Sequence, residues 1–164
     1  MTRKTAFAPV VDHRTRVLIL GSLPGDASLA AEQYYAHPRN QFWPIVGEVI
    51  GRDLVSLAYP ERLAALLTAR IGLWDTVASA RRSGSLDGAI REVETASLPE
   101  LTAGLPQLCA IGFNGSISAR IGRKALGYDD RFTLLDLPST SPAYCAITVA
   151  QKQQKWNLLR KYLS

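Results

Sequence analysis

Seven consecutive residues, His37 to Trp43, bring together side-chain types that serve in catalysis and in the binding of planar ligands. A carboxamide such as that of Asn40 both accepts and donates hydrogen bonds, so it is suited to orienting a reactant more than to removing a proton. Phe42 offers a flat apolar face on which a nucleobase would stack with roughly 1–3 kcal/mol. Two simpler interpretations stay open, namely that Asn40 caps the following helix and that Phe42 packs in the core.

Short aliphatic runs alternate with amphipathic segments along the chain and predict an α/β fold. Strands are expected at 16–21, 71–77, 108–113 and 132–137, and helices at 44–50, from 60, from 97, at 116–126 and at 149–163. This alternation predicts a single three-layer domain, with a mainly parallel four-stranded sheet covered by helices on both faces. Residues 1–15 are expected to be an N-terminal lead-in to the domain at 16–164, and residues 21–28 and 79–88 are expected to be loops.

Polar and turn-forming residues follow each expected strand. In parallel α/β sheets ligands bind in the crevice beyond the carboxyl ends of the strands, so these residues should gather around one site. With residues 37–43 they form the candidate site: Gly21, Ser22, Asp75, Asn114, Ser139, Thr140, Ser141 and Pro142. Arg81 and Arg82, within the polar segment 79–88, are candidate contacts to a polyanion.

The chain has 164 residues, of which 19 are basic and 14 acidic, giving a formal charge of +5. That balance fits a polyanionic partner without identifying one. The longest apolar runs are far shorter than a membrane span requires, and the first dozen residues lack a secretory signal pattern, so a cytoplasmic protein is expected. The two cysteines and two histidines have spacings that predict neither a disulfide framework nor a metal site. No cofactor is expected.

Four segments, taken together and in order, resemble the uracil-DNA glycosylase superfamily. Gly21-Ser22-Leu23-Pro24-Gly25 is similar to its first motif, and residues 37–43 are similar to the segment that carries the base-stacking phenylalanine in the mismatch-specific branch. Residues 72–77 resemble the strand that reads the base edge, and residues 137–143 resemble the closing motif that presses into the duplex. The resemblance is strongest to the hypoxanthine-DNA glycosylases. It implies a monomeric enzyme, without metal or cofactor, that acts on DNA containing a deaminated base, either hypoxanthine or uracil.

The resemblance also implies a role for each candidate residue. Leu23 and Leu137 stand where other branches have polar catalytic residues, so the catalytic role moves to Asn40, whose amide oxygen is expected to accept from the attacking water. Phe42 is expected to stack on the flipped base, beside Gly21 and Ser22. Asp75 is expected to accept a hydrogen bond from N1–H of hypoxanthine, which adenine lacks. DNA backbone contacts are expected from Asn114, Ser139, Thr140, Ser141, Pro142, Arg81 and Arg82.

Two other functions stay open at this point. The chain is either a non-catalytic DNA-binding relative, which Leu23 and Leu137 make conceivable, or a small serine esterase or nucleotide hydrolase that uses Ser22 or Ser141. The second is weakened because no Gly-x-Ser-x-Gly elbow occurs and only two histidines are present. No lysine falls in the crevice motifs, so a glycosylase of this kind is expected to be monofunctional, without a Schiff-base lyase step.

Overall fold

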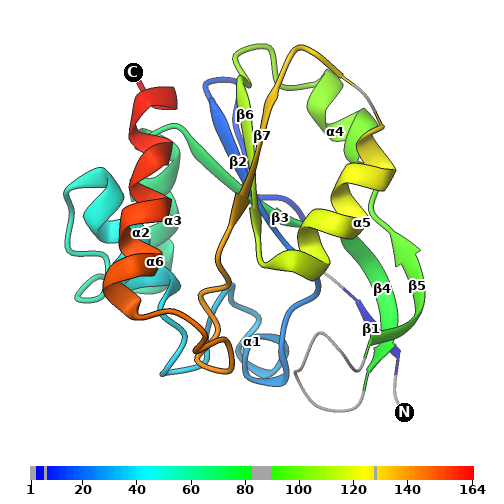
Figure 1. Ribbon diagram of the computed structural model, residues 1–164, viewed down its shortest axis with the longest axis horizontal. Helices are drawn as coiled ribbons and strands as arrows, with labels where there is room; N and C mark the ends of the chain where they lie inside the picture. Colours follow the sequence, from blue (N-terminus) through cyan, green and yellow to red (C-terminus); the bar gives the residue numbers. More distant parts are fainter. Residues whose placement is uncertain (1–2, 6, 83–89, 128) are drawn as a thin grey trace.

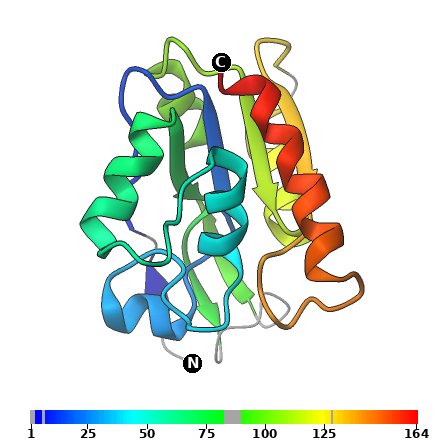
Figure 2. The same ribbon diagram turned by 90° about the vertical axis from the view of Figure 1, so that its left-hand side faces the viewer.

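A four-stranded parallel sheet forms the centre of the molecule. The computed structural model describes residues 3–5, 7–82, 90–127 and 129–164. The sheet has the order β3-β2-β6-β7 and is built from β2 (Val17–Gly21), β3 (Ile71–Asp75), β6 (Ala110–Asn114) and β7 (Thr133–Leu137). All three pairings are parallel. The predicted three-layer α/β fold is confirmed, with helices on both sides of the sheet (Figures 1 and 2).

The helices divide between the two faces. One face is covered by α2 (Phe42–Ile50), α3 (Tyr59–Thr68) and α6 (Val149–Trp156), which continues as a 3-10 helix at Asn157–Tyr162. The other face is covered by α4 (Leu98–Ala103) and α5 (Ser116–Leu126). A short helix, α1 (Asp26–Ala31), follows β2 and begins within the segment 21–28, which was expected to be a loop. No helix among the described residues is both long and apolar enough to cross a membrane.

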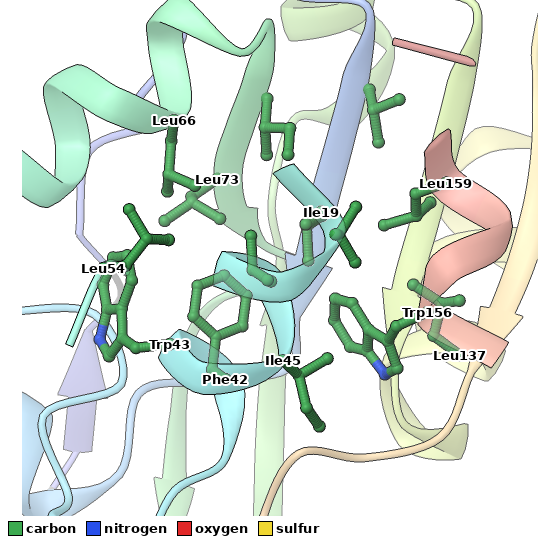
Figure 3. Close-up of a cluster of buried hydrophobic side chains, with 14 of the residues drawn as sticks. Ile19, Phe42, Trp43, Ile45, Leu54, Leu66, Leu73, Leu137, Trp156 and Leu159 are labelled. Atoms are coloured by element: carbon green, nitrogen blue, oxygen red, sulfur yellow. The ribbon is translucent and has the colours of Figure 1, made fainter. Parts of the chain in front are cut away.

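Strand β2 shows why the central strands are continuous aliphatic runs. Successive side chains of a strand point to opposite faces, and here both faces are covered. Val17 and Ile19 pack in the cluster that holds α2 and α6, whereas Leu18 and Leu20 pack in the cluster that holds α4 and α5. Figure 3 shows the first cluster, in which Ile19 lies between the helices and the sheet. The sheet is therefore a rigid base for the residues at its strand ends.

A second, three-stranded sheet corrects the sequence prediction. Segment 79–88 was expected to be a loop, but β4 (Val77–Arg82) and β5 (Ile90–Thr95) form an antiparallel pair, and residues 83–89 lie outside the described residues. The N-terminal lead-in also contributes β1 (Arg3–Thr5), which pairs with β4. Polar strands of this kind depend on partners distant in sequence. Ser79, for example, donates to a carboxylate oxygen of Glu94 at 2.9 Å across the β4–β5 pair.

Gly122 is expected to resist replacement although it lies inside helix α5. Alanine normally stabilises a helix interior by about 1 kcal/mol relative to glycine. A Cβ at Gly122, however, would lie 2.3 Å from a ring carbon of Phe113 and 3.0 Å from Thr76 Cγ2, both on fully buried residues. Overpacking of this kind costs roughly 1–3 kcal/mol. We therefore expect Gly122→Ala to lower the free energy of unfolding in urea denaturation, and an increase would contradict this packing.

Candidate functional site

A cavity of about 270 Å³ opens beyond the carboxyl ends of the parallel strands. Its wall comes from the loop after β2, from the segment that leads into α2, and from the ends of β3, β6 and β7, as the crevice rule predicts. Most of the predicted site residues line it. The lining consists of Gly21, Ser22, Leu23, Pro24, Gly25, Ala27, Ser28, Tyr34, Tyr35, His37, Asn40, Asp75, Asn114, Ser139, Thr140, Ser141, Pro142 and Ala143.

Gly21 sits against the buried carboxylate of Asp75. A Cβ at this glycine would lie 2.7 Å from Asp75 Oδ1 and 3.2 Å from Tyr35 Oη, so no larger residue fits without displacing one of them. The backbone carbonyls of Gly21 and Ser22 accept from Thr76 N at 2.8 Å and Val77 N at 3.0 Å, which anchors the loop to the β3–β4 junction. Because Gly21 has no Cβ, the side chains of Asp75 and Tyr35 can both lie against the end of β2 in the cavity wall.

Asp75 presents a carboxylate in a nearly dry position. The residue is 3% exposed at the end of β3, and it lines the cavity. Burial, and after it the charge of Asp75, raises the pKa of the neighbouring Tyr34 hydroxyl far above its ordinary value. Tyr34 therefore stays protonated and donates to the Ala8 carbonyl at 3.2 Å. A buried carboxylate at a cavity wall is suited to accept a hydrogen bond from a ligand N–H group.

Tyr35, together with Tyr34 but not Phe42, brings an aromatic side chain to the cavity. Phe42 is 0% exposed and packs in the core, with Trp43 and Trp156 edge-on to its ring (Figure 3). The ring of Tyr35 lies flat on Phe42, with centroids 3.9 Å apart and an interplanar angle of 13°. The prediction that Phe42 offers the stacking face is therefore wrong, because Tyr35 covers that face and itself lines the cavity.

The backbone of Tyr35 explains how its ring reaches this place. Its φ of 54° lies in the left-handed region, which costs a bulky residue about 1–2 kcal/mol. The surrounding contacts hold it there, because the ring stacks on Phe42 and its hydroxyl accepts from Asn114 Nδ2 at 3.3 Å. In the sequence, the only indication that Tyr35 lines the cavity was that two adjacent aromatic residues, Tyr34 and Tyr35, come shortly before His37.

Asn40 lies at the cavity wall with its amide oxygen engaged. Its Oδ1 accepts from the backbone N–H of Phe42 at 3.0 Å and from the hydroxyl of Thr140 at 2.8 Å. The first bond joins Asn40 to the first residue of α2, but the N-cap residue of that helix is Gln41, so Asn40 supports the start of the helix from the position before the cap and also lines the cavity. Two hydrogen bonds occupy both lone pairs of a carbonyl oxygen. The oxygen is therefore not available to accept from a water molecule, as the sequence interpretation required.

Thr140 and Asn114 correct the prediction of phosphate contacts at these two positions. Thr140 is 1% exposed, and its backbone N donates to Asn114 Oδ1 at 3.0 Å. Asn114 Nδ2 donates back to Thr140 Oγ1 at 3.0 Å. Their polar atoms therefore bind each other inside the wall, because the loop after β7 folds over the end of β6. The sequence analysis placed Thr140 and Asn114 at the site but did not predict the pair of hydrogen bonds between them.

Of the remaining predicted DNA contacts, the three in the loop after β7 lie at the rim of the cavity. Ser139, Ser141 and Pro142 line it, and the two serine hydroxyls accept backbone N–H groups of their own loop, at 3.1 and 3.2 Å. Arg81 and Arg82 end β4, the central strand of the three-stranded sheet, and their side chains lie outside what the structure describes. His37 fixes its loop, since its Nδ1 accepts from Arg39 N at 3.1 Å. No group of three or more metal-ligating residues occurs among the described residues.

Lys152 is a buried cation that the sequence interpretation did not place at the site. It is 1% exposed, and its Nζ donates to Gln41 Oε1 at 2.8 Å and to the Ser141 carbonyl at 3.2 Å. The backbone N of Gln41 donates to the Thr140 carbonyl at 2.9 Å. Lys152 therefore joins the start of α2 to the loop after β7, and these two segments carry Asn40 and Thr140.

The stability of the protein should depend on pH through this lysine. Burial lowers the pKa of the Lys152 ammonium below its ordinary value of 10.5, an effect that Cys145 partly opposes. Between the folded and unfolded pKa values the unfolded chain binds more protons, so the free energy of unfolding rises with pH over that interval. We expect wild-type protein to gain stability relative to Lys152→Met as the pH approaches 10.5. Urea denaturation of both proteins from pH 7 upward measures this, and a difference that moves in favour of the variant contradicts it.

Comparison with known proteins places this geometry in context. The family model described as the uracil DNA glycosylase superfamily matches residues 8–161. A protein named hypoxanthine DNA glycosylase from Methanosarcina barkeri is 42% identical over 134 residues, which cover 80% of this chain and 85% of the relative. One of the same name from Methanosarcina acetivorans is 39% identical over 142 residues, which cover 85% of this chain and 87% of the relative. A solution NMR structure from Methanosarcina acetivorans, of a candidate uracil DNA glycosylase, superposes with a TM-score of 0.85 at 35% identity and covers 99% of each chain.

Proposed function

The chain belongs to the uracil DNA glycosylase superfamily, and from that premise we propose that it is a monofunctional DNA glycosylase that removes hypoxanthine from DNA. Its relatives named for hypoxanthine match most of the chain, which supports this substrate ahead of uracil. Uracil presents the same donor and acceptor pattern on the edge concerned, so we include it as a secondary substrate. The enzyme acts on DNA, as a monomer, in the cytoplasm.

The observation that carries the proposal is the meeting of Asn40, Asp75 and Tyr35 at one cavity. A base swung out of the stack loses a few kcal/mol of stacking and pairing, which the site must offset. The ring of Tyr35 supplies a stacking face worth roughly 1–3 kcal/mol. Asp75 accepts a hydrogen bond from N1–H of hypoxanthine or N3–H of uracil. Adenine has a lone pair at N1, so it would face the carboxylate with an unfavourable pair of acceptors.

Hydrolysis then breaks the bond between C1′ of the sugar and the base nitrogen. The electron pair of that bond goes to the base, positive charge develops on the sugar, and the oxygen of a water molecule bonds to C1′. Phosphates of the DNA stabilise the cationic sugar. Asn40 contributes by orientation, because a carboxamide is neutral and is a poor base.

The serines and Pro142 at the rim, with Arg81 and Arg82, form the proposed path of the DNA backbone. Hydroxyl and backbone N–H groups of Ser139 and Ser141 suit phosphate oxygens. The two arginines would add contacts whose contribution falls as salt is raised. None of the described residues lining the cavity is a lysine, which agrees with hydrolysis without a lyase step.

The test is an excision panel on duplex and single-stranded oligonucleotides that carry hypoxanthine, uracil or xanthine. We expect alkali-labile sites at hypoxanthine, fewer at uracil, and no strand cleavage without alkali. Salt-sensitive binding with no excision of any base would support the non-catalytic relative instead. Turnover of a model ester that is lost in Ser22→Ala would support the esterase.

A further inference from the structure

We propose that Asn40 acts as a hydrogen-bond donor, and that Thr140 is the positioning residue that, together with the Phe42 backbone N–H, holds it in that orientation. The inference rests on the proposed glycosylase function and deepens it. It concerns how the amide of Asn40 is oriented, which decides whether this residue handles the water molecule or the departing base.

The orientation of Asn40 follows from a partner that can only donate. The atom of Asn40 that faces the backbone N of Phe42 at 3.0 Å must be the oxygen, because a backbone N–H is a donor. The same oxygen receives the Thr140 hydroxyl at 2.8 Å. The amide nitrogen is therefore the end of the side chain left to face the cavity, and no hydrogen bond to it occurs within the described residues.

The orientation of the Thr140 hydroxyl is determined in the same way. The backbone N of Thr140 donates to one amide atom of Asn114 at 3.0 Å, so that atom is Oδ1. Nδ2 of Asn114 must then be the donor to Thr140 Oγ1 at 3.0 Å. Since Oγ1 accepts there, its own proton is directed to Asn40 Oδ1. The backbone N–H groups of Thr140 and Phe42 thus set the direction of each hydrogen bond that links Asn114 through Thr140 to Asn40.

An amide nitrogen at the cavity stabilises negative charge and does not accept a proton. The electron pair of the C1′–N bond goes to the departing base, which is where negative charge develops during hydrolysis. The NH2 group of Asn40 therefore donates to the base. The water molecule gives its oxygen to C1′, and one of its protons ends on the released base, so atoms and charge balance. No step requires Asn40 to take up a proton.

The consequence is testable with Asn40→Asp, compared with Asn40→Ala. A carboxylate keeps an oxygen toward Phe42 but replaces the donor facing the cavity by an acceptor. We expect single-turnover excision by Asn40→Asp to fall as far as that by Asn40→Ala, roughly 10²–10³-fold, above neutral pH. It should recover as the pH is lowered, because a protonated carboxyl again donates. Wild-type or higher activity of Asn40→Asp at neutral pH overturns the donor role.

The role of Thr140 is tested by Thr140→Val and Thr140→Ser. Valine removes one of the two donors that hold the Asn40 oxygen and leaves the Phe42 N–H to hold the amide alone, so we expect the single-turnover rate to fall about tenfold while affinity for the DNA stays the same. Serine keeps the hydroxyl and should recover most of the rate. A folded Thr140→Val protein that retains the wild-type rate overturns the positioning role.

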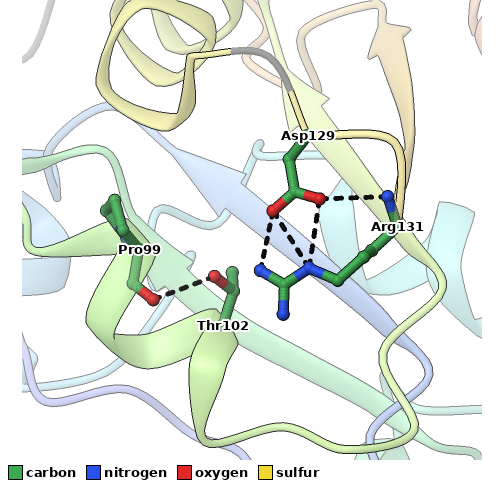
Figure 4. Close-up of polar contacts among 4 residues, drawn as sticks. All are labelled: Pro99, Thr102, Asp129 and Arg131. Carbon is green, nitrogen blue, oxygen red and sulfur yellow. Dashed lines mark hydrogen bonds and ion pairs between the residues drawn. The ribbon is translucent and has the colours of Figure 1, made fainter.

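Thr102→Val is the matched control, because it too removes a buried threonine hydroxyl. Thr102 is 3% exposed, and its hydroxyl donates to the Pro99 carbonyl at 3.2 Å (Figure 4). It lies in α4, at the opposite end of the sheet from α1 (Figure 1). Thr140→Val loses two hydroxyl hydrogen bonds and Thr102→Val loses one, and only Thr140→Val should lose rate.

A spectroscopic measurement separates this inference from the proposed function. The side-chain NH2 signals of Asn40 in a 15N-labelled sample are identified by their loss in Asn40→Ala. We expect Thr140→Val to shift or broaden them, whether or not any base is excised, and Thr102→Val to leave them in place. Unchanged signals in Thr140→Val overturn the hydrogen-bond chain. Absence of excision by wild-type protein, with the shift observed, overturns the proposed function alone.

Discussion

Replacing Asn40 by alanine is expected to reduce the single-turnover rate of hypoxanthine excision by roughly 10²–10³-fold, the range found when one preorganised donor is removed from an enzyme. Among the described residues that line the cavity, the substitution leaves only the carboxamide of Asn114, whose amide atoms are engaged with Thr140 and Tyr35. Stacking on Tyr35 and recognition by Asp75 would remain. The variant should therefore bind the damaged DNA with near wild-type affinity and fail in the chemical step.

A control is needed because Asn40→Ala also removes a side-chain hydrogen bond to the first residue of α2. Loss of the bond to Phe42 N is expected to cost about 1 kcal/mol of stability. Thr148→Ala removes a comparable side-chain hydrogen bond at the start of a helix that contributes no residue to the cavity lining. The Thr148 side chain accepts from Gln151 N at 3.1 Å at the start of α6. Both variants should melt at slightly lower temperature, and only Asn40→Ala should lose excision. Full activity of folded Asn40→Ala would remove Asn40 from the mechanism.

Asp75→Asn is expected to lower hypoxanthine excision by roughly 5- to 150-fold, which corresponds to about 1–3 kcal/mol for an unpaired polar group at the base edge. An amide at this position can offer its NH2 to the N1 lone pair of adenine, so discrimination between hypoxanthine and adenine should narrow. The measurement is the ratio of excision rates on matched oligonucleotides. An unchanged ratio of excision rates would show that Asp75 does not recognise the base.

The stability of Asp75→Asn should move in the opposite direction to its activity. Asp75 is 3% exposed, and a carboxylate at such a position is costly to bury. We expect the melting temperature of the variant to be equal to or higher than that of wild type. Asp129→Asn is the matched control, since it makes the same change in a carboxylate bound to Arg131 at 2.7 Å, away from the cavity (Figure 4). It should leave the excision ratio unchanged.

The parallel sheet and the place of the site were predictable because they depend on local patterns. Aliphatic runs such as Val17 to Leu20 are typical of strands buried on both faces, and the last residue of such a strand must lie at the carboxyl edge. Gly21, Asp75 and Asn114 all follow from that rule, and the structure places them at one cavity. The second sheet was missed, since β4 and β5 are polar and are stabilised by pairing between distant residues.

Residue types, their spacing and their order along the chain thus determined by themselves the α/β class, the end of the sheet that carries the cavity, and the presence of Asn40 and Asp75 there. Only the tertiary structure decided which aromatic residue lines the cavity and which atoms of Asn40 are already engaged in hydrogen bonds. Tyr35 covers Phe42 because its backbone adopts φ 54° within a packed wall. The Asn40 oxygen is occupied because Thr140, 100 residues away, donates to it. Side-chain direction depends on such distant partners, and spacing along a chain does not contain them.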